Sequence, residues 1–260
     1  MIDASRGLGL FSLKGQIVVV TGATGGIGVE VARGLGAAGA RVGLNGRRSA
    51  PVEDLAAEIS GSFALPFDIT DETASSDALA SVVEQYGRLD ALVCIAAARD
   101  RRPLAEIAAD DYRAVLEANL VAPFHLARAA APYMISANRG RIIMMTSLAG
   151  DFAMPGDAAY PSSKAGLAGL VRSLAVELGA FGVNVNGIAP GPIATQVNAA
   201  LVKDPEWQAM IRRTVPLQRW AEPSELAGAV IFLASDASSY VNGQILTVDG
   251  GASVRLFPMD

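Results

Sequence analysis

Short runs rich in valine and isoleucine alternate with longer alanine-rich stretches of helical period along most of the 260-residue chain. Repeated alternation of this kind predicts a parallel sheet with helices on both faces. Several runs lack an alternation of polar and apolar residues, which indicates that both sheet faces are buried. The expected strands are residues 16–20, 41–44, 62–66, 91–95, 141–145, 184–189 and 244–248. The expected helices are residues 26–38, 52–59, 71–86, 111–133, 158–181 and 222–234.

No linker, repeat or change of composition divides the chain, so we expect one α/β domain over residues 1–260. Its fold would be a Rossmann-type doubly wound parallel sheet of about seven strands. The segment 190–220 is unusual because it holds four prolines and only short helical patterns. Its length and its place after a strand predict a substrate-covering lid at about 191–220, with a plain surface excursion as the alternative.

Composition and charge narrow the class of protein. With 51% hydrophobic and 18% charged residues, the chain can bury enough apolar surface to fold. The net charge of −5 disfavours nucleic acid or an anionic membrane as partners, and the longest apolar runs are too short to span a bilayer. One cysteine, Cys94, and one histidine, His125, cannot form an internal disulfide or a structural zinc site. We therefore expect a cytoplasmic protein with no metal; residues 1–11 do not resemble a secretory signal.

A glycine-rich turn follows the first expected strand and precedes a helix: Thr-Gly-Ala-Thr-Gly-Gly-Ile-Gly, residues 21–28. Such glycines let the backbone approach a pyrophosphate, whose charge then meets the N–H groups at the helix start. The spacing G-x-x-x-G-x-G matches neither the common dinucleotide fingerprint nor a P-loop. A tight turn that serves only helix packing is the alternative.

The second expected strand ends at the sequence Asn-Gly-Arg-Arg, residues 45–48. A doubly wound dinucleotide site places its ribose-reading residue at about this distance from the glycines. An acid there would suit NAD(H), whereas Arg47 and Arg48 can bind a 2′-phosphate. NADP(H) is therefore the expected cofactor and NAD(H) the alternative. Arginines on a solvated turn would be the purely structural interpretation.

Tyr160 and Lys164 open another expected helix, with Asp157 as its predicted cap. Residues four apart share a helix face, so the Lys164 ammonium should lie beside the Tyr160 phenol and lower its pKa from near 10. A phenol tuned in this way could exchange a proton with a substrate oxygen near neutral pH. An ordinary amphipathic helix carrying one tyrosine and one lysine is the alternative.

Taken together, the motifs resemble those of the short-chain dehydrogenase/reductase family, from about residue 13 to residue 251. They occur in family order and spacing: Thr21-Gly22-x-x-x-Gly26-Ile27-Gly28, Asp68-Ile69, Asn119, Ser147, Tyr160-x-x-x-Lys164, Pro190-Gly191 and Val248-Asp249-Gly250-Gly251.

The resemblance implies four catalytic residues. Ser147 would hydrogen-bond the substrate carbonyl, and Tyr160 would protonate it as hydride arrives from the nicotinamide. Lys164 would bind the nicotinamide ribose and acidify Tyr160, while Asn119 would hold a water that connects Lys164 to solvent. The structural alternatives are a strand-end hydroxyl that caps the next turn for Ser147 and a packed helix amide for Asn119.

The resemblance also implies the cofactor contacts. The implied contact residues are Gly22, Gly26, Ile27 and Gly28 at the pyrophosphate, Arg47 at the 2′-phosphate, Asp68 and Ile69 around adenine, Ala96 and Lys164, and Pro190, Gly191, Ile193 and Thr195 near the nicotinamide. The chain departs from the family in two places. Gly25 stands where a second base often anchors the phosphate, and Cys94-Ile95-Ala96-Ala97 replaces the usual Asn-Asn-Ala-Gly.

Those replacements remove a strand-tying asparagine and add the Ala97 methyl group beside the cofactor, so weaker cofactor binding or a shifted pocket is expected. Cys94 is interpreted as a small buried hydrophobe. His125 lies on an alanine-rich face, typical of a core or interface position.

Within the family, the chain is most similar to gluconate 5-dehydrogenase-type members, which implies a sugar-acid substrate. Arg99, Arg101 and Arg102 follow the fourth expected strand and could meet its carboxylate, although solvated surface arginines are the favoured interpretation.

Two alternatives stay open. Reduction of a 3-oxoacyl thioester or hydrophobic ketone would need a more apolar mouth around Leu148, Asp151, Phe152 and Met154. The altered 94–97 segment motivates a non-catalytic nucleotide-binding protein. Family members are usually homotetramers built through two long helices, here residues 111–133 and 158–181.

Overall fold

The seven strands found within residues 4–255, the part of the chain that the computed structural model describes, form one parallel sheet in the order β3-β2-β1-β4-β5-β6-β7. The strands are β1 (Ile17–Thr21), β2 (Arg41–Gly46), β3 (Phe63–Pro66), β4 (Ala91–Cys94), β5 (Gly140–Met145), β6 (Val183–Pro190) and β7 (Ile245–Val248). The chain winds outward in both directions from β1, so the predicted doubly wound sheet is confirmed. A switch point between β1 and β4 opens a crevice at the carboxyl edge, where ligands bind in such folds.

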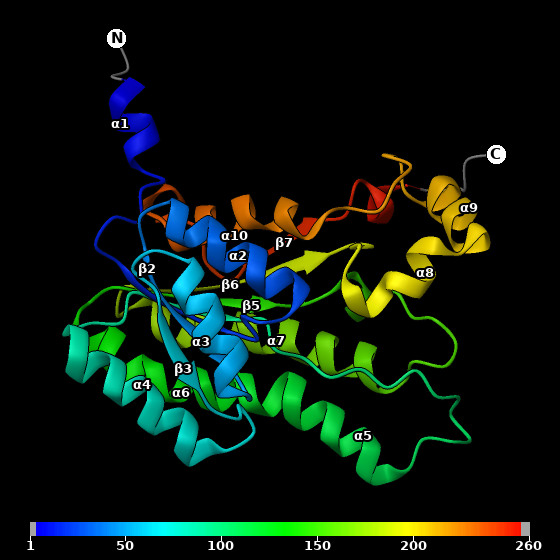
Figure 1. Ribbon diagram of the computed structural model, residues 1–260, viewed down its shortest axis with the longest axis horizontal. Helices are drawn as coiled ribbons and strands as arrows, with labels where there is room; N and C mark the ends of the chain where they lie inside the picture. Colours follow the sequence, from blue (N-terminus) through cyan, green and yellow to red (C-terminus); the bar gives the residue numbers. More distant parts are fainter. Residues whose placement is uncertain (1–3, 256–260) are drawn as a thin grey trace.

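Helices cover both faces of the sheet, as Figure 1 shows. They are α1 (Ala4–Gly9), α2 (Gly26–Ala37), α3 (Ser49–Glu58), α4 (Glu72–Tyr86), α5 (Ala109–Leu116), α6 (Ala122–Ser136), α7 (Ala159–Gly179), α8 (Ala199–Lys203), α9 (Pro205–Thr214) and α10 (Ala227–Ala234). One core joins the sheet to α2, α3 and α10, and a second joins it to α4, α6 and α7. Strand β1 supplies both cores: Val18 and Val20 face the first, while Ile17 and Val19 face the second. This is why residues 17–20 of β1 show no polar position.

The helix expected at residues 111–133 is a longer, interrupted helical run. It begins as α5, widens into a π-helix at Glu117–Val121 and continues as α6. Pro123 lacks the N–H that would complete an α-helical bond to the carbonyl of Asn119, so a wider turn is accommodated just before it. Single π-turns often mark functional positions, and this one contains Asn119.

Two further segments differ from the sequence prediction. Helix α1 was not predicted, and the helix expected at residues 222–234 starts as a 3₁₀ turn, Pro223–Leu226, before α10. Residues 191–220 contain a 3₁₀ turn, Gln196–Asn198, followed by α8 and α9. A parallel bridge between Ile193 and Ala221 joins the base of this segment. Among residues 4–255, no helix is both long and apolar enough to cross a membrane.

Candidate active site

Ser147 lies just beyond the carboxyl end of β5 and has two roles in the structure. Its Oγ accepts the N–H of Ala149 at 3.1 Å and so caps a 3₁₀ turn, Leu148–Gly150. Its hydroxyl also shares a hydrogen bond with the phenol of Tyr160. The capping alternative and the placement beside Tyr160 are therefore both found, because one serine oxygen can make several bonds.

Tyr160 sits in the first turn of α7, but Asp157 does not cap that helix as the sequence predicted. The N-terminal residue of the helix is preceded by Ala158, which makes no side-chain capping bond. The Asp157 carboxylate instead accepts from Nε of Arg99 at 2.9 Å and from the same guanidinium's Nη2. Asp157 is therefore engaged in an ion pair with Arg99 and does not cap α7.

Lys164 is buried one turn further along α7. Its Nζ donates to the carbonyl oxygen of Met145 at 2.7 Å and lies 5.5 Å from the centroid of the Tyr160 ring. Burial lowers the pKa of the Lys164 ammonium from 10.5 to about 8. The amine is thus poised near neutral pH at the floor of the site.

The pKa of Tyr160 is raised above its ordinary value because burial is the largest influence on the phenol. The hydrogen bond with Ser147 and the charge of Arg99 oppose this effect. The low pKa predicted from the Tyr-x-x-x-Lys spacing is therefore wrong for this structure. Shared helix faces place the two side chains together, but Lys164 directs its ammonium at the Met145 carbonyl.

Asn119 is buried in the π-turn and joins two segments of the site. Its Oδ1 accepts the N–H of Ala98 at 2.7 Å, and its Nδ2 donates to the Ala98 carbonyl at 2.8 Å and to Ser163 Oγ at 3.0 Å. Ser163 in turn donates to the Tyr160 carbonyl at 2.7 Å. Sequence reasoning missed Ser163, whose position three residues after Tyr160 on a helix was the available signal.

The glycine-rich turn has the close approaches that its glycines predict. A Cβ on Gly22 would lie 2.8 Å from the backbone of Ala96, and a Cβ on Gly28 would lie 2.1 Å from the Gly22 carbonyl oxygen. Gly25 precedes α2 with no side-chain cap, and residues 24–26 are exposed. Exposed N–H groups at the start of a helix suit a phosphate, so the turn fits a dinucleotide.

Two polar side chains whose roles the sequence analysis did not predict hold this turn in place. Asn45 accepts the Gly22 N–H at 3.4 Å and donates to the Phe67 carbonyl at 2.9 Å. Thr21 Oγ1 accepts the N–H groups of Ile95 at 3.2 Å and Ala96 at 3.4 Å. Thr21 therefore ties β1 to the end of β4, although the usual asparagine is absent from position 94.

Cys94 agrees with its interpretation as a small buried hydrophobe. It is 3% exposed, and burial raises the pKa of its thiol to about 12. The neighbouring Lys164 charge opposes that rise without overcoming it. The thiol is therefore protonated and of low reactivity at neutral pH.

Arg47 and Asp68 lie at the carboxyl edge near the glycine-rich turn. A Cβ on Gly46, the last residue of β2, would lie 3.1 Å from Thr24 Oγ1, which places exposed Arg47 close to the turn. Hydrogen bonding by the Thr70 backbone is the main effect that lowers the pKa of Asp68, and Arg47 adds to it. Ile69 is buried next to this carboxylate.

The segment after β6 borders the same crevice. Gly191 donates its N–H to the Val248 carbonyl at 2.9 Å, while Ile193 is buried. Thr195 packs against Gly26, whose added Cβ would lie 3.4 Å from that of Thr195. A cleft of about 420 Å³ is bordered by Thr24, Gly26, Thr195 and Ser224 among others.

The loop that follows β4 carries three arginines, all of which have partners. Arg99 pairs with Asp157, and Arg102 pairs with both Asp100 and Asp111. Arg101 donates to the Asn198 side-chain oxygen at 2.9 Å. The three arginines are exposed, which agrees with the favoured expectation of surface arginines, and they also contact Asp100 in the loop, Asp111 in α5, Asp157 before α7 and Asn198 in the 191–220 segment.

Comparison with known proteins gives the class. Residues 22–253 match the family model described as enoyl-(acyl carrier protein) reductase. Together with the parallel sheet and the Ser147, Tyr160 and Lys164 geometry, this match shows that the chain belongs to the short-chain dehydrogenase/reductase family of oxidoreductases.

Individual relatives share nearly the full length. The chain is 38% identical to gluconate 5-dehydrogenase of Gluconobacter oxydans, over 95% of this chain and 98% of the relative. It is 35% identical to a 3-oxoacyl-(acyl-carrier-protein) reductase of Synechocystis, over 92% and 98%. A crystal structure of a gluconate 5-dehydrogenase from Burkholderia cenocepacia in complex with NADP and tartrate is similar at a TM-score of 0.93 with 34% identity, covering 96% of this chain and 100% of that one.

Proposed function

We propose that the protein is an NADP(H)-dependent oxidoreductase that interconverts a secondary alcohol and a carbonyl on a sugar acid of the gluconate type. The observation that carries this proposal is the position of the Tyr160 phenol at the carboxyl edge of the sheet. The phenol is hydrogen-bonded to Ser147, and the Lys164 ammonium lies near its ring. The named relatives that act on gluconate support the substrate class.

Two side chains, Ser147 and Tyr160, would act directly on the substrate oxygen. Bound NADP(H) would supply or accept the hydride. The hydroxyls of Ser147 and Tyr160, which already share a hydrogen bond, would hold the substrate oxygen between them. Tyr160 would give its proton to that oxygen during reduction and take it back during oxidation.

Lys164 and Asn119 would return the proton to Tyr160. Both Nδ2 hydrogens of Asn119 are used inside the protein, so a water could be held by the second lone pair of Oδ1 or by the backbone carbonyl that Pro123 cannot engage. Lys164 has two ammonium hydrogens beyond the one given to Met145, which suits a ribose hydroxyl and that water.

The cofactor would lie along the crevice between the glycine-rich turn and the segment after β6. The residues proposed to hold it are Gly22, Gly26, Ile27, Gly28, Arg47, Asp68, Ile69, Ala96, Lys164, Pro190, Gly191, Ile193 and Thr195. Arg47 would bind the 2′-phosphate. Arg47→Ala should weaken NADPH binding about tenfold and leave NADH binding within about twofold, measured by fluorescence titration. Equal losses for both would remove the assignment.

Arg101 supports an acidic substrate. It extends from the loop beside Tyr160 and, within residues 4–255, pairs with an amide oxygen while its neighbours pair with carboxylates. Its charge is therefore available to a substrate carboxylate. Arg101→Met should raise KM for gluconate about tenfold with little change for an uncharged polyol, whereas Arg102→Met, the matched control, should alter neither. A uniform loss on both substrates would contradict carboxylate recognition.

A second candidate is reduction of a 3-oxoacyl thioester or hydrophobic ketone. Phe152 and Met154, which follow Ser147 in the chain, are 55% and 46% exposed, which would give the expected mouth an apolar rim. Oxidation and reduction assays across sugar acids, acyl thioesters and simple ketones would separate the two. Stoichiometric NADPH binding without turnover on any of them would contradict both.

We further propose one domain over residues 1–260 in which residues 191–220 cover the substrate, and a homotetramer located in the cytoplasm. Phe124 on α6 and Val176 on α7 leave 38% and 86% of their surface exposed, which favours helix pairing between copies. Sedimentation of wild type and Val176→Glu would test the assembly. An unchanged mass for this variant would argue against an interface through α7.

A further inference from the structure

The guanidinium of Arg99 lies over the ring of Tyr160, with its central carbon 4.5 Å from the ring centroid. This is closer than the Lys164 Nζ, at 5.5 Å. The Arg99 side chain is 28% exposed, so its contact with the ring is partly shielded from water. A cation stacked on a half-buried phenol both restrains the ring and stabilises its charged form.

Asp157 holds this guanidinium in place. Its carboxylate is 4% exposed and accepts from both Nε and Nη2 of Arg99 through the same oxygen, Oδ2. The other oxygen, Oδ1, is buried without a hydrogen-bond partner in the part of the chain that the structure describes. A buried carboxylate is costly to leave unpaired, so Asp157 strongly favours the stacked position of Arg99.

Four charged groups and one hydroxyl surround the Tyr160 phenol. Arg99 and Arg101 lower the pKa of Tyr160, Asp157 raises it, and the Ser147 hydrogen bond lowers it. Lys164 Nζ lies 5.5 Å from the centroid of the ring and donates to the Met145 carbonyl. Arg99 has the largest effect of these charges, although burial outweighs it.

We propose that Arg99, fixed by Asp157, is a positioning residue that orients the Tyr160 phenol and promotes its ionisation for proton transfer. This inference rests on the proposed proton role of Tyr160. In this proposal Arg99, from the loop after β4, favours the ionised form of Tyr160, which is the role that the helical spacing had predicted for Lys164.

The first test observes the phenol directly and needs no turnover. Protein labelled with 3-fluorotyrosine gives one ¹⁹F signal for each of its five tyrosines, and Tyr160→Phe identifies the signal of interest. Fluorination makes the phenol more acidic, which brings the titration closer to neutral pH. Arg99→Met should move the Tyr160 midpoint to higher pH, and Arg99→Lys should restore part of the difference. Asp157→Asn keeps an oxygen that can accept from Arg99 and removes the buried negative charge that disfavours the phenolate, so it should move the midpoint to lower pH.

The second test is the pH profile of kcat for alcohol oxidation, which requires the phenolate. At pH 7 Arg99→Met should lower kcat about tenfold, with recovery toward the wild-type plateau as pH rises. Arg102→Met is the matched control, since its acid partners lie in its own loop and α5, and it should leave both the profile and the ¹⁹F midpoint unchanged.

Because Arg99→Met leaves Asp157 buried and unpaired, the double variant Arg99→Met with Asp157→Asn guards against misfolding. Its midpoint should still exceed that of wild type, since Arg99 outweighs Asp157 at the phenol. Unchanged midpoints in folded Arg99→Met would overturn the proposal, as would a lowered kcat plateau with an unshifted profile. If wild type lacks activity while its midpoints shift as described, the proposed function fails and the Arg99 effect on Tyr160 stands.

Discussion

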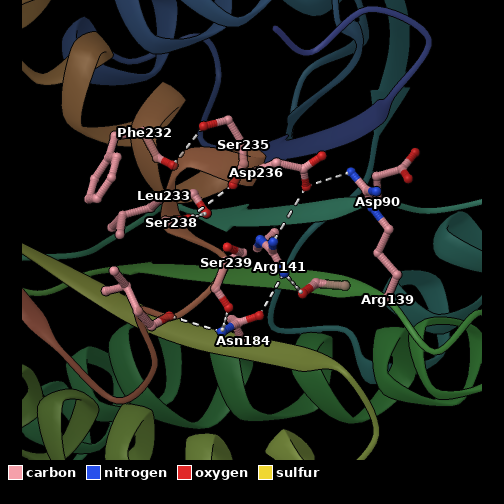
Figure 2. A network of polar contacts seen from close by, with 12 residues as sticks. Asp90, Arg139, Arg141, Asn184, Phe232, Leu233, Ser235, Asp236, Ser238 and Ser239 are labelled. Carbon is pink, nitrogen blue, oxygen red and sulfur yellow. Dashed lines mark hydrogen bonds and ion pairs between the residues drawn. The ribbon is translucent and has the colours of Figure 1, made fainter. Parts of the chain in front are cut away.

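The amino and carboxyl edges of the sheet at β4, β5 and β6 differ in how many protein partners their buried charged side chains have. At the amino ends, Asp90 accepts the Ile17 N–H and the Arg88 Nε, both at 2.8 Å. Arg141, 7% exposed, donates to the Asn184 side-chain oxygen at 2.6 Å and lies 3.7 Å from Asp236, as Figure 2 shows. Most of these charges are matched by protein partners, although Arg141 Nε has none among the described residues.

At the carboxyl ends, charge and hydrogen-bonding capacity are left over. Lys164 is buried with one hydrogen-bond acceptor among the described residues, and Asp157 keeps an unpartnered oxygen. The glycine-rich turn presents exposed backbone there. The comparison teaches that polar groups tie strands together at both edges, as Thr21 and Asn45 do at the carboxyl edge, but that the carboxyl edge also combines exposed backbone with a buried ammonium that a ligand can complete.

The largest effect should come from Tyr160→Phe, which removes the proton and keeps the ring. If the reaction takes place at the carboxyl edge of the sheet, kcat should fall by roughly a hundredfold or more, while NADPH affinity stays within about twofold. Tyr86→Phe is a matched control, because Tyr86 packs on Phe63, 4.7 Å between ring centroids, at the end of α4. Near-normal turnover of Tyr160→Phe would contradict the placement of the reaction at the carboxyl edge.

Lys164→Met should abolish most activity and also change how stability depends on pH. The native pKa of Lys164 is lowered from 10.5 to about 8, so the unfolded chain binds more protons between these values. Wild type should therefore gain about 3 kcal/mol of unfolding free energy relative to the variant as pH rises from about 8 to 10.5, with the full penalty present below pH 8.

Urea unfolding at several pH values measures this difference. The two proteins should have parallel pH profiles below pH 8 and diverge above it. Parallel profiles up to pH 10.5 would show that the Lys164 ammonium is adequately solvated or paired in the native protein.

Asp90→Ala should lower the unfolding free energy by about 2 kcal/mol and leave kcat within about twofold of wild type. The loss follows because the Ile17 N–H and the Arg88 guanidinium lose their shared acceptor at the amino edge. Asp110→Ala is the control, since the Asp110 side chain is 94% exposed. A large fall in kcat in folded Asp90→Ala would mean that the two edges are coupled.

The smallest effect should come from Arg139→Ala. Arg139 pairs with Asp236 at 3.0 Å, and both side chains are more than 40% exposed, at 43% and 49%. Such a pair contributes less than about 1 kcal/mol, and 1 M salt should remove the difference from wild type in urea unfolding. A larger, salt-resistant loss would place Arg139 in the buried part of the Figure 2 network.

The pattern of the sequence was sufficient for the sheet and for most helices. Apolar residues at consecutive positions of β1 can be satisfied only when both faces are covered, and alternate valines do enter two different cores. The π-turn around Asn119 was missed, because a helical period of about 3.6 residues hides a single wider turn. Only Pro123 marked its place.

The sequence predicted the local contacts of the candidate site but not its long-range contacts, for a physical reason. Tyr160, Lys164 and Ser163 are neighbours through local helix geometry, which spacing along the chain encodes. Arg99 and Asp157 meet across 58 positions, and Asn45 meets Phe67 across 22. Contacts at such separations depend on how elements pack, so the sequence could name Arg99 and Asp157 without pairing them.

By itself, the sequence determined a doubly wound parallel sheet and the glycine turn after its first strand, since periodicity and local spacing fix these, whereas the resemblance to a known family indicated Asn119 and Ser147. The tertiary structure decided which charge reaches the Tyr160 phenol and how far burial counteracts it. The electrostatic environment of a side chain is the sum over everything packed around it, and here the leading charge comes from Arg99 on the loop after β4, whereas the tyrosine lies in α7.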